Sequence, residues 1–316
     1  MRILSEVIRQ MTLFNLRDVT RESHMGWLDG LEHIVRTDEP LAPRCALRIG
    51  GSSEFFAEPT NLDEMTLIVQ RAREEGLALR LLGGGSNLLV CDEGVKGVTI
   101  SLAAPEFGKI AIEGNVVRAG CGAMLAHVIA TAAREGLAGL EILTSIPGTV
   151  GGALHGNSGD RATDIGRFTQ SATVLTRSGD VIKRGRDDMT FAYREGSLDE
   201  LAMVEAEFAL ESEDREELTR RMQKIWIVKR AGYPMGGQPT GYLFKDPLGM
   251  TAAELIEQAG MKGAEVGGAS LFERDPNFVV LQGDASTSHV IQLMDQVREQ
   301  VTQQVGVDLE TNIQIW

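Results

Sequence analysis

Two glycine-rich segments of this chain have the composition of backbone sites that hold phosphate. The first consists of Gly83, Gly84, Gly85, Ser86, Asn87 and Leu88, and the second consists of Ile146, Pro147, Gly148, Thr149, Val150, Gly151 and Gly152. Because glycine adopts conformations that other residues avoid, consecutive N–H groups can point toward one anion, and Ser86 and Asn87 add side-chain donors. Each segment alone could be a tight turn between strands, but together they favour a bound pyrophosphate.

Common phosphate-binding and hydrolase motifs do not account for these segments. The chain has no GxxxxGK string followed by Ser or Thr, the glycine triplet 83–85 lacks GxGxxG spacing, and the string GGGSNLL fails the last position of GxSxG. The three cysteines form no CxxC pair and the five histidines have no metal-ligand spacing. We therefore expect neither a simple dinucleotide fold nor a metal site.

The composition limits the partners. The chain has 316 residues, and 31 Lys plus Arg against 45 Asp plus Glu give a formal net charge of −14. An acidic surface repels polyanions, so we expect neither nucleic acid nor an anionic membrane as the main partner. No apolar stretch approaches the roughly 20 residues of a spanning helix, and the N-terminus lacks the apolar region of a signal peptide. We therefore expect a cytoplasmic protein without membrane insertion.

Hydrophobic periodicity predicts the elements that must position the glycine-rich segments. Residues 62–76 show helical spacing between two apolar strands, and the second of these strands leads into the first segment. Short strands joined by Gly, Asn and Ser-Gly-Asp turns follow between 94 and 210, interrupted by a helix near 124–135. A charged helix over 211–230 opens a further region, which ends in a strand over 308–316.

At these residues the sequence resembles the UDP-N-acetylenolpyruvoylglucosamine reductases (MurB), which are FAD enzymes of peptidoglycan precursor synthesis. The matching blocks occur in the family's order from about 43 to 316, and they include LGGGSNLLVCDEG, EILTSIPGTVGGALHGNSG, FAYREGSL, GYLFKDP and LETNIQIW. The IPGTVGG and LGGGSNLL blocks are specific to this flavoprotein type. The chain is most similar to the shorter, type II members.

The resemblance implies an α+β chain with a two-lobed FAD-binding fold of the vanillyl-alcohol-oxidase/PCMH type, followed by a smaller α+β substrate domain. We place the first FAD-binding lobe at 25–107, the second at 108–213 and the substrate domain at 214–316. Residues 1–24 would then be an N-terminal extension of unknown role, and a weak amphipathic pattern over 1–35 indicates one or two helices. The sequence does not determine the oligomeric state, and a monomer is favoured.

The resemblance also implies the cofactors, FAD and NADPH, and the reaction. FAD pyrophosphate would lie on both glycine-rich segments, and a hydride from NADPH would pass through the flavin to UDP-N-acetylglucosamine enolpyruvate, giving UDP-N-acetylmuramate. This step builds negative charge on a conjugated carboxylate, which calls for a cation and a proton donor. Arg194 matches the family's cation, and Tyr193, Lys229, Lys245 and Asn312 are expected to bind the UDP sugar.

The proton-handling positions depart from the family's pattern. Tyr242 stands where the family has Ser or Cys, and Asp246 replaces an Asn four residues later. Asn312 stands at the position of the family's catalytic Glu, and an amide cannot hold a catalytic proton. Glu310 lies two residues earlier on the same face of the expected strand, so it is the nearest replacement. We expect Tyr242 to act as the substitute donor.

Two other functions remain open because both proton-handling groups differ. The chain could be an FAD-binding relative without reductase activity, which acts as a binding or regulatory module. It could also be a flavin oxidoreductase for a substrate that needs no protonation at carbon. The glycine-rich segments match the family more closely than the substrate domain does, so FAD binding is better supported than turnover. We favour the reductase.

Overall fold

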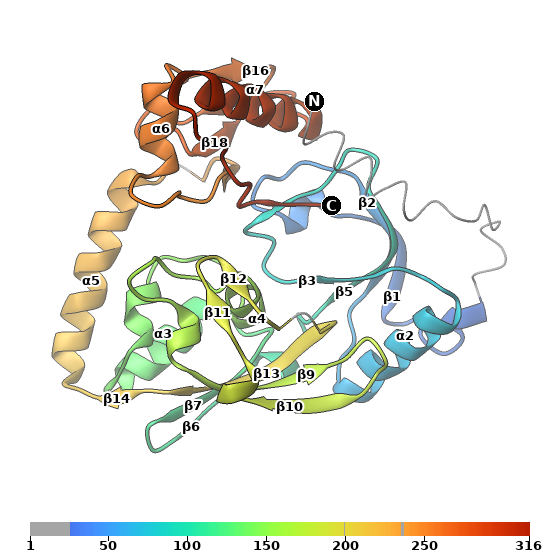
Figure 1. Cartoon of the computed structure of the whole chain (residues 1–316). Coiled ribbons are helices and arrows are strands. Elements are labelled where there is room, and N and C mark those ends of the chain that lie inside the picture. The colour runs from blue at the N-terminus through green and yellow to red at the C-terminus, as the bar shows by residue number, and fades with distance from the viewer. Residues whose placement is uncertain (1–25, 199, 235–236) are drawn as a thin grey trace.

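The structure contains three main sheets, each in a different part of the chain. The computed structural model describes residues 26–198, 200–234 and 237–316, and its main sheets have four, five and four strands. Figure 1 shows the first two sheets adjacent to each other and the C-terminal part above them, with helix α5 (Arg215–Gly232) running up one side as the connection. The mixture of helices and strands confirms the expected α+β class. The expected extension 1–24 lies outside the described residues.

The first sheet has the strand order β1-β2-β5-β3. Its strands are β1 (Val35–Pro40), β2 (Ser52–Ala57), β3 (Leu79–Leu82) and β5 (Val95–Ser101), and its helices are α2 (Leu62–Glu74), η2 (Ala42–Arg44) and η3 (Pro105–Gly108). Asn61 begins α2 because its side chain accepts a hydrogen bond from the backbone of Glu64. Helix α2 buries the predicted apolar face against the sheet, and β2 and β3 both run parallel to β5. The predicted strand–helix–strand unit is confirmed.

The second sheet has the order β10-β9-β13-β7-β6, with every neighbouring pair antiparallel. Its strands are β6 (Ile110–Glu113), β7 (Val116–Gly120), β9 (Thr169–Leu175), β10 (Val181–Gly185) and β13 (Ala202–Ala209). Helices α3 (Leu125–Arg134), α4 (Val150–His155), η4 (Leu140–Leu143), η5 (Ile165–Arg167) and η6 (Arg186–Asp188) accompany it, as do two short pairs, β11 (Phe191–Ala192) with β12 (Glu195–Gly196) and β8 (Leu137–Ala138) with β14 (Glu211–Ser212).

The C-terminal part combines a third sheet, of order β15-β18-β17-β16, with two helices. Its elements are β15 (Thr240–Tyr242), α6 (Ala252–Gln258), β16 (Glu265–Val266), β17 (Ala269–Leu271), β18 (Phe278–Leu281) and α7 (Thr287–Val305). The chain then returns to the first part, where β19 (Gln314–Ile315) pairs in parallel with β4 (Leu88–Leu89) at the end of the first glycine-rich segment. None of the helices in the described ranges is long and apolar enough to cross a membrane.

Two expectations about secondary structure were wrong. Residues 26–34 form turns and a short 3-10 segment rather than the end of a helix, because Trp27, Leu28 and Leu31 bury against the first sheet as an irregular cluster. The expected strand over 308–316 reduces to β19 and one isolated bridge between Thr311 and Phe244. Its side-chain alternation therefore cannot be used to place Glu310 and Asn312 on one strand face.

The hydrophobic clusters cross the boundaries between the three parts. The C-terminal cluster contains Leu47 and Leu89 from the first part, and the cluster under the first sheet contains Leu175 and Leu201 from the second part. Burial of apolar surface in shared clusters fixes the parts against one another. This arrangement holds the two glycine-rich segments and the C-terminal strands at one meeting point.

Candidate active site

The two glycine-rich segments are in contact, although they lie about 60 residues apart in the chain. A β-carbon on Gly84 would lie 2.7 Å from the α-carbon of Gly148, which is closer than real side chains approach backbone. The Ser86 hydroxyl donates to the carbonyl oxygen of Pro147 at 3.1 Å. Glycine is therefore needed on the first loop for contact with the second, and together the loops form one surface.

This surface carries backbone donors that have no acceptor among the residues that the structure describes. The N–H groups of Gly84, Gly85, Ser86, Gly148 and Thr149 donate no hydrogen bond to any residue in the described ranges. This surface is open to a ligand, because it includes four exposed residues, Gly83, Gly84, Pro147 and Gly152. Backbone donors without partners are costly unless an anion or water takes them. The donor set fits a pyrophosphate, as the sequence predicts.

Arg194 occupies the turn of the β11–β12 hairpin in a conformation that non-glycine residues rarely adopt. Its φ is 60°, and its Nε is buried without a hydrogen-bond partner in the described part of the chain. Positive φ at a bulky residue costs on the order of 1 kcal/mol or more and concentrates at functional sites. An unsatisfied buried guanidinium nitrogen is likewise expensive unless a ligand accepts from it. Both features favour the predicted role of Arg194 as a ligand-binding cation.

Asp246 joins the second part of the chain to the C-terminal part. Its carboxylate accepts from the Tyr193 hydroxyl at 3.3 Å, from the Tyr242 hydroxyl at 3.3 Å and from the backbone N–H of Ala252 at 2.8 Å. Tyr193 comes from the β11–β12 hairpin and Tyr242 comes from β15, so one carboxylate orients two phenols from different parts. Asp246 and Tyr242, which both depart from the family's pattern, are therefore hydrogen-bonded to each other.

Tyr242 remains a protonated phenol in this environment. Burial raises the pKa of the Tyr242 hydroxyl well above its ordinary value of 10.0, and the negative charge of Asp246 raises the pKa further. The ring is held against Phe278, with 4.9 Å between the ring centroids. A phenol with a raised pKa is a weaker acid than a free one, but it keeps its proton available at neutral and moderately alkaline pH.

Asn312 connects Tyr242 with the first glycine-rich segment. The Asn312 amide donates to the Asn87 side-chain oxygen at 3.2 Å and to the carbonyl oxygen of Tyr242 at 3.4 Å. The Asn87 amide in turn donates to the carbonyl oxygen of Asn312 at 2.9 Å. One amide thus links the first glycine-rich segment to the backbone of Tyr242, although Asn312 itself cannot supply a catalytic proton.

Three other predicted residues have different surroundings. Burial lowers the pKa of Lys229, the charge of Asp160 opposes that shift, and the charge of Arg194 adds to it, so this lysine lies close to both. In contrast, Lys245 and Glu310 pair with each other, with 3.3 Å between the Lys245 Nζ and Glu310 Oε2 atoms. The Glu310 side chain is 76% exposed, and that position does not favour a role as proton donor.

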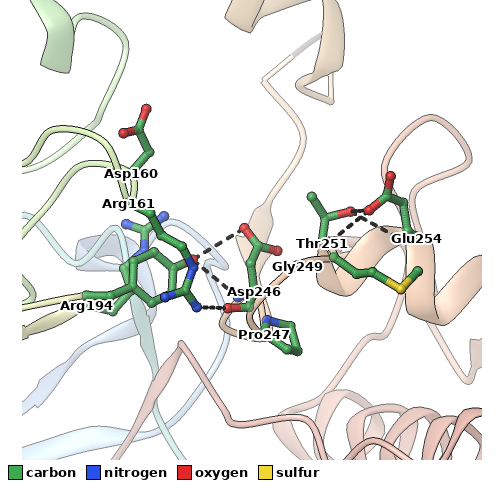
Figure 2. A pocket seen from close by; sticks show the side chains of 10 residues that line it. Asp160, Arg161, Arg194, Asp246, Pro247, Gly249, Thr251 and Glu254 are labelled. Atoms are coloured by element: carbon green, nitrogen blue, oxygen red, sulfur yellow. Dashed lines mark hydrogen bonds between the residues drawn. The ribbon is translucent and has the colours of Figure 1, made fainter.

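A pocket of about 340 Å³ lies between the hairpin that carries Arg194 and the start of α6. In the view of Figure 2, Arg161 and Arg194 lie on one side, Thr251 and Glu254 lie on the other, and Asp246 lies between them. Sequence reasoning identified Arg194 and Asp246 but missed Arg161 and Asp160. Their only signal was proximity to the second glycine-rich segment, and the loop fold that brings them here is not readable from spacing.

The fold and the glycine loops define the class of protein. Residues 53–185 match the family described as an FAD binding domain. The crystal structure of 6-hydroxy-D-nicotine oxidase from Arthrobacter nicotinovorans has the same fold, with a TM-score of 0.58, 16% identity and coverage of 88% of this chain and 84% of that chain. The chain is therefore an FAD-binding protein with the expected two-lobed fold.

The C-terminal part specifies the family. Residues 233–316 match the C-terminal domain of UDP-N-acetylenolpyruvoylglucosamine reductase. Proteins of that name from Rhodopirellula baltica and Bacillus subtilis are 38% and 32% identical over 91% and 89% of this chain, and over 94% and 93% of their own lengths. The Thermus caldophilus reductase structure has a TM-score of 0.77 and 32% identity, covering 89% of this chain and 99% of that chain. The chain belongs to the UDP-N-acetylenolpyruvoylglucosamine reductase family, a family of flavin-dependent oxidoreductases, which confirms the resemblance stated from the motifs.

Proposed function

We propose that this protein reduces UDP-N-acetylglucosamine enolpyruvate to UDP-N-acetylmuramate with FAD and NADPH, in the supply of peptidoglycan precursors. The observation that carries the proposal is the continuous set of contacts from the glycine loops through Asn87 and Asn312 to Tyr242. These contacts link the backbone of the proposed donor residue to the surface on which the cofactor would bind. Bound FAD would supply the hydride chemistry, taking a hydride from NADPH and giving it to the enolpyruvyl group.

The roles of the chain's own residues follow from charge and geometry. Arg194 would bind the enolpyruvyl carboxylate, because its unpaired buried Nε and its planar fork suit a carboxylate whose negative charge grows during the reaction. Tyr242 would give the proton to the carbon next to the one that receives the hydride, and the resulting phenolate would take a proton back from solvent. Asn312 would hold the Tyr242 backbone in place.

The remaining predicted residues have supporting roles in this proposal. Tyr193 orders Asp246 and the wall of the pocket, and Lys229 adds positive charge near Arg194. Lys245 and Glu310 form an ion pair with each other, so we propose that Lys245 acts at the edge of the site and that Glu310 holds it there. The three free, buried cysteines support a reducing compartment such as the cytoplasm.

The test is a turnover assay on the FAD-loaded protein with NADPH and the enolpyruvyl sugar, followed by mass spectrometry of the product. We expect a rate of NADPH consumption that depends on the sugar, with UDP-N-acetylmuramate as product. Arg194→Gln should lower kcat/KM by about 100-fold to 1,000-fold, as removal of a charge-stabilising donor does. Arg167→Gln is the matched control, because Arg167 is exposed and does not line the pocket.

Failure of this assay has a defined meaning. If the protein retains FAD but forms no product, the reductase proposal is wrong and the alternative of a binding or regulatory module gains support. If the Arg194 variant is as active as the parent protein, the assignment of the carboxylate to Arg194 is wrong although the reaction stands.

A further inference from the structure

Arg161 extends from the loop after α4 to the backbone of Asp246 in the C-terminal part. Its guanidinium carbon lies 3.8 Å from the centroid of the Tyr193 ring, and its Nη2 donates to the backbone carbonyl of Asp246. It lines the same pocket as Arg194, and Figure 2 shows the two arginines on the same side of it. Stacking on an aromatic face holds a guanidinium in a fixed plane while leaving its edge available for hydrogen bonds.

Neither pocket arginine has a carboxylate partner within the described part of the chain. No ion pair of Arg161 or Arg194 occurs among the residues that the structure describes, although other arginines of this acidic chain pair closely, such as Arg221 with Glu141 at 2.7 Å. A chain with a net charge of −14 offers many carboxylates. Two guanidinium groups without one, in a single pocket, are the arrangement of a site for an anion from outside the chain.

The carboxylates of the pocket are already engaged by other groups. Asp160 accepts from the backbone N–H groups of Ala162 and Thr163, and Glu254 accepts from Thr251 at the start of α6. Asp246 accepts from two phenols and a backbone N–H. These hydrogen bonds stabilise each carboxylate in its present position. None of the three carboxylates therefore pairs with Arg161 or Arg194 in the way that an anionic ligand would.

We propose that Arg161 is a second substrate-binding cation of this enzyme, which contacts an anionic group of the UDP sugar together with Arg194. The proposal rests on the proposed function and deepens it. It also supplies the positive charge that the replacement of Asn by Asp at 246 demands, because an added carboxylate beside an anionic substrate weakens binding unless a cation offsets it. Lys245 does not provide that charge, since it pairs with Glu310.

The anionic group is either the enolpyruvyl carboxylate or the diphosphate, which share the chemistry that a guanidinium recognises. Two ligands separate them: UDP-N-acetylglucosamine carries the diphosphate alone, and its enolpyruvyl ether carries both groups. The experiment is isothermal titration of each ligand into the FAD-loaded protein without NADPH, so that no turnover occurs. Arg161→Met keeps the apolar stem and Arg161→Lys keeps the charge. Arg167→Met is the control, because Arg167 is exposed and does not line the pocket.

We expect Arg161→Met to weaken binding about tenfold or more, with Arg161→Lys intermediate and Arg167→Met unchanged. The affinity of the Arg161→Met variant should also depend less on salt concentration, a change that a merely structural role would not produce. Loss of affinity for both ligands would assign Arg161 to the diphosphate, and loss for the enolpyruvyl sugar alone would assign it to the carboxylate. Retained FAD and an unchanged melting temperature would show that the variants are folded.

Two results would overturn the proposal, and they differ in meaning. If the parent protein binds the ligands and Arg161→Met binds them equally well, Arg161 is not a substrate-binding residue, while the proposed function stands. If the parent protein itself binds neither ligand, the proposed function fails and this inference fails with it.

Discussion

Tyr242 and Asp246 form a hydrogen-bonded pair of side chains. The phenol at 242 needs an acceptor for its proton, and the carboxylate at 246 supplies one at 3.3 Å while it also accepts from Tyr193. A carboxylate has only acceptor oxygens, so it suits a position that faces two phenols and a backbone N–H. The two departures from the family's pattern, which in sequence look like separate losses, therefore form one hydrogen-bonded unit.

Asp246→Asn should lower the pKa of the Tyr242 hydroxyl. The charge of Asp246 is the second cause of the raised pKa, after burial, so its removal should reduce the shift without abolishing it. Alkaline titration of tyrosine absorbance measures this change, because the chain has only three tyrosines and the Tyr242→Phe variant identifies the relevant one. The expected pH profile of kcat in the parent protein has no alkaline fall caused by Tyr242 up to about pH 10, the ordinary pKa of a phenol.

The pairing would be contradicted by a Tyr242 titration that is the same in the Asp246→Asn variant and in the parent protein.

At the scale of the elements, the two glycine loops act as one unit. Gly84→Ala should reduce the affinity for FAD, because the new β-carbon would lie 2.7 Å from the Gly148 α-carbon and would force the loops apart. Crowding of this kind typically costs about 1–3 kcal/mol, so we expect a loss of about tenfold or more in affinity. Flavin absorbance per protein after dialysis measures the effect.

Gly108→Ala is the matched control for the loop, because a β-carbon at 108 meets nothing within 4 Å. Equal FAD retention in the Gly84→Ala and Gly108→Ala variants would show that close contact between the loops is not needed to bind the cofactor.

One carboxylate of the second sheet, Glu207, should make the stability of the protein sensitive to acid. On β13, a hydrogen bond from Ser171 and then one from Lys183 lower the pKa of Glu207 to about 2, well below its ordinary value of 4.5. Because the folded pKa is below the unfolded one, this stabilisation is present above about pH 4.5 and is lost as the pH falls toward 2. Glu207→Gln should therefore cost up to about 3 kcal/mol of unfolding free energy at pH 7 and progressively less in acid.

Denaturant unfolding of the parent protein and the Glu207→Gln variant at a series of pH values measures this difference. A difference in unfolding free energy that stays constant from pH 7 to pH 3 would rule out the stabilising role of the Glu207 charge.

At the scale of the whole molecule, shared cores decide where the site forms. Leu89 directly follows the first glycine loop, and it packs in the C-terminal cluster with Phe244, which lies two residues beyond the end of β15 at Tyr242. The cofactor loop and the donor strand are thus held by the same apolar contacts. We propose that the three segments with boundaries near 108 and 214 are structural units that depend on one another for this packing.

Local patterns predicted the elements of this molecule better than they predicted its site. Helix α2 and the short strands follow from periodicity, whereas the composition of the glycine segments predicted a shared phosphate site but not the contact between Gly84 and Gly148. The position of Arg161 depends on a loop and on Tyr193, which comes from another hairpin, and no spacing encodes that meeting. The exposure of Glu310 was also not predictable, because the expected strand does not form there and is reduced to a single bridge at Thr311 and the short β19.

The most direct test of the central claim is anaerobic reoxidation of the reduced protein. The FAD-loaded chain is reduced with one equivalent of NADPH, UDP-N-acetylglucosamine enolpyruvate is added without oxygen, and flavin absorbance is followed in a stopped-flow instrument. We predict that the oxidised flavin spectrum returns with formation of one equivalent of UDP-N-acetylmuramate. A flavin that stays reduced in the presence of saturating sugar would contradict the assignment of this chain as a working reductase.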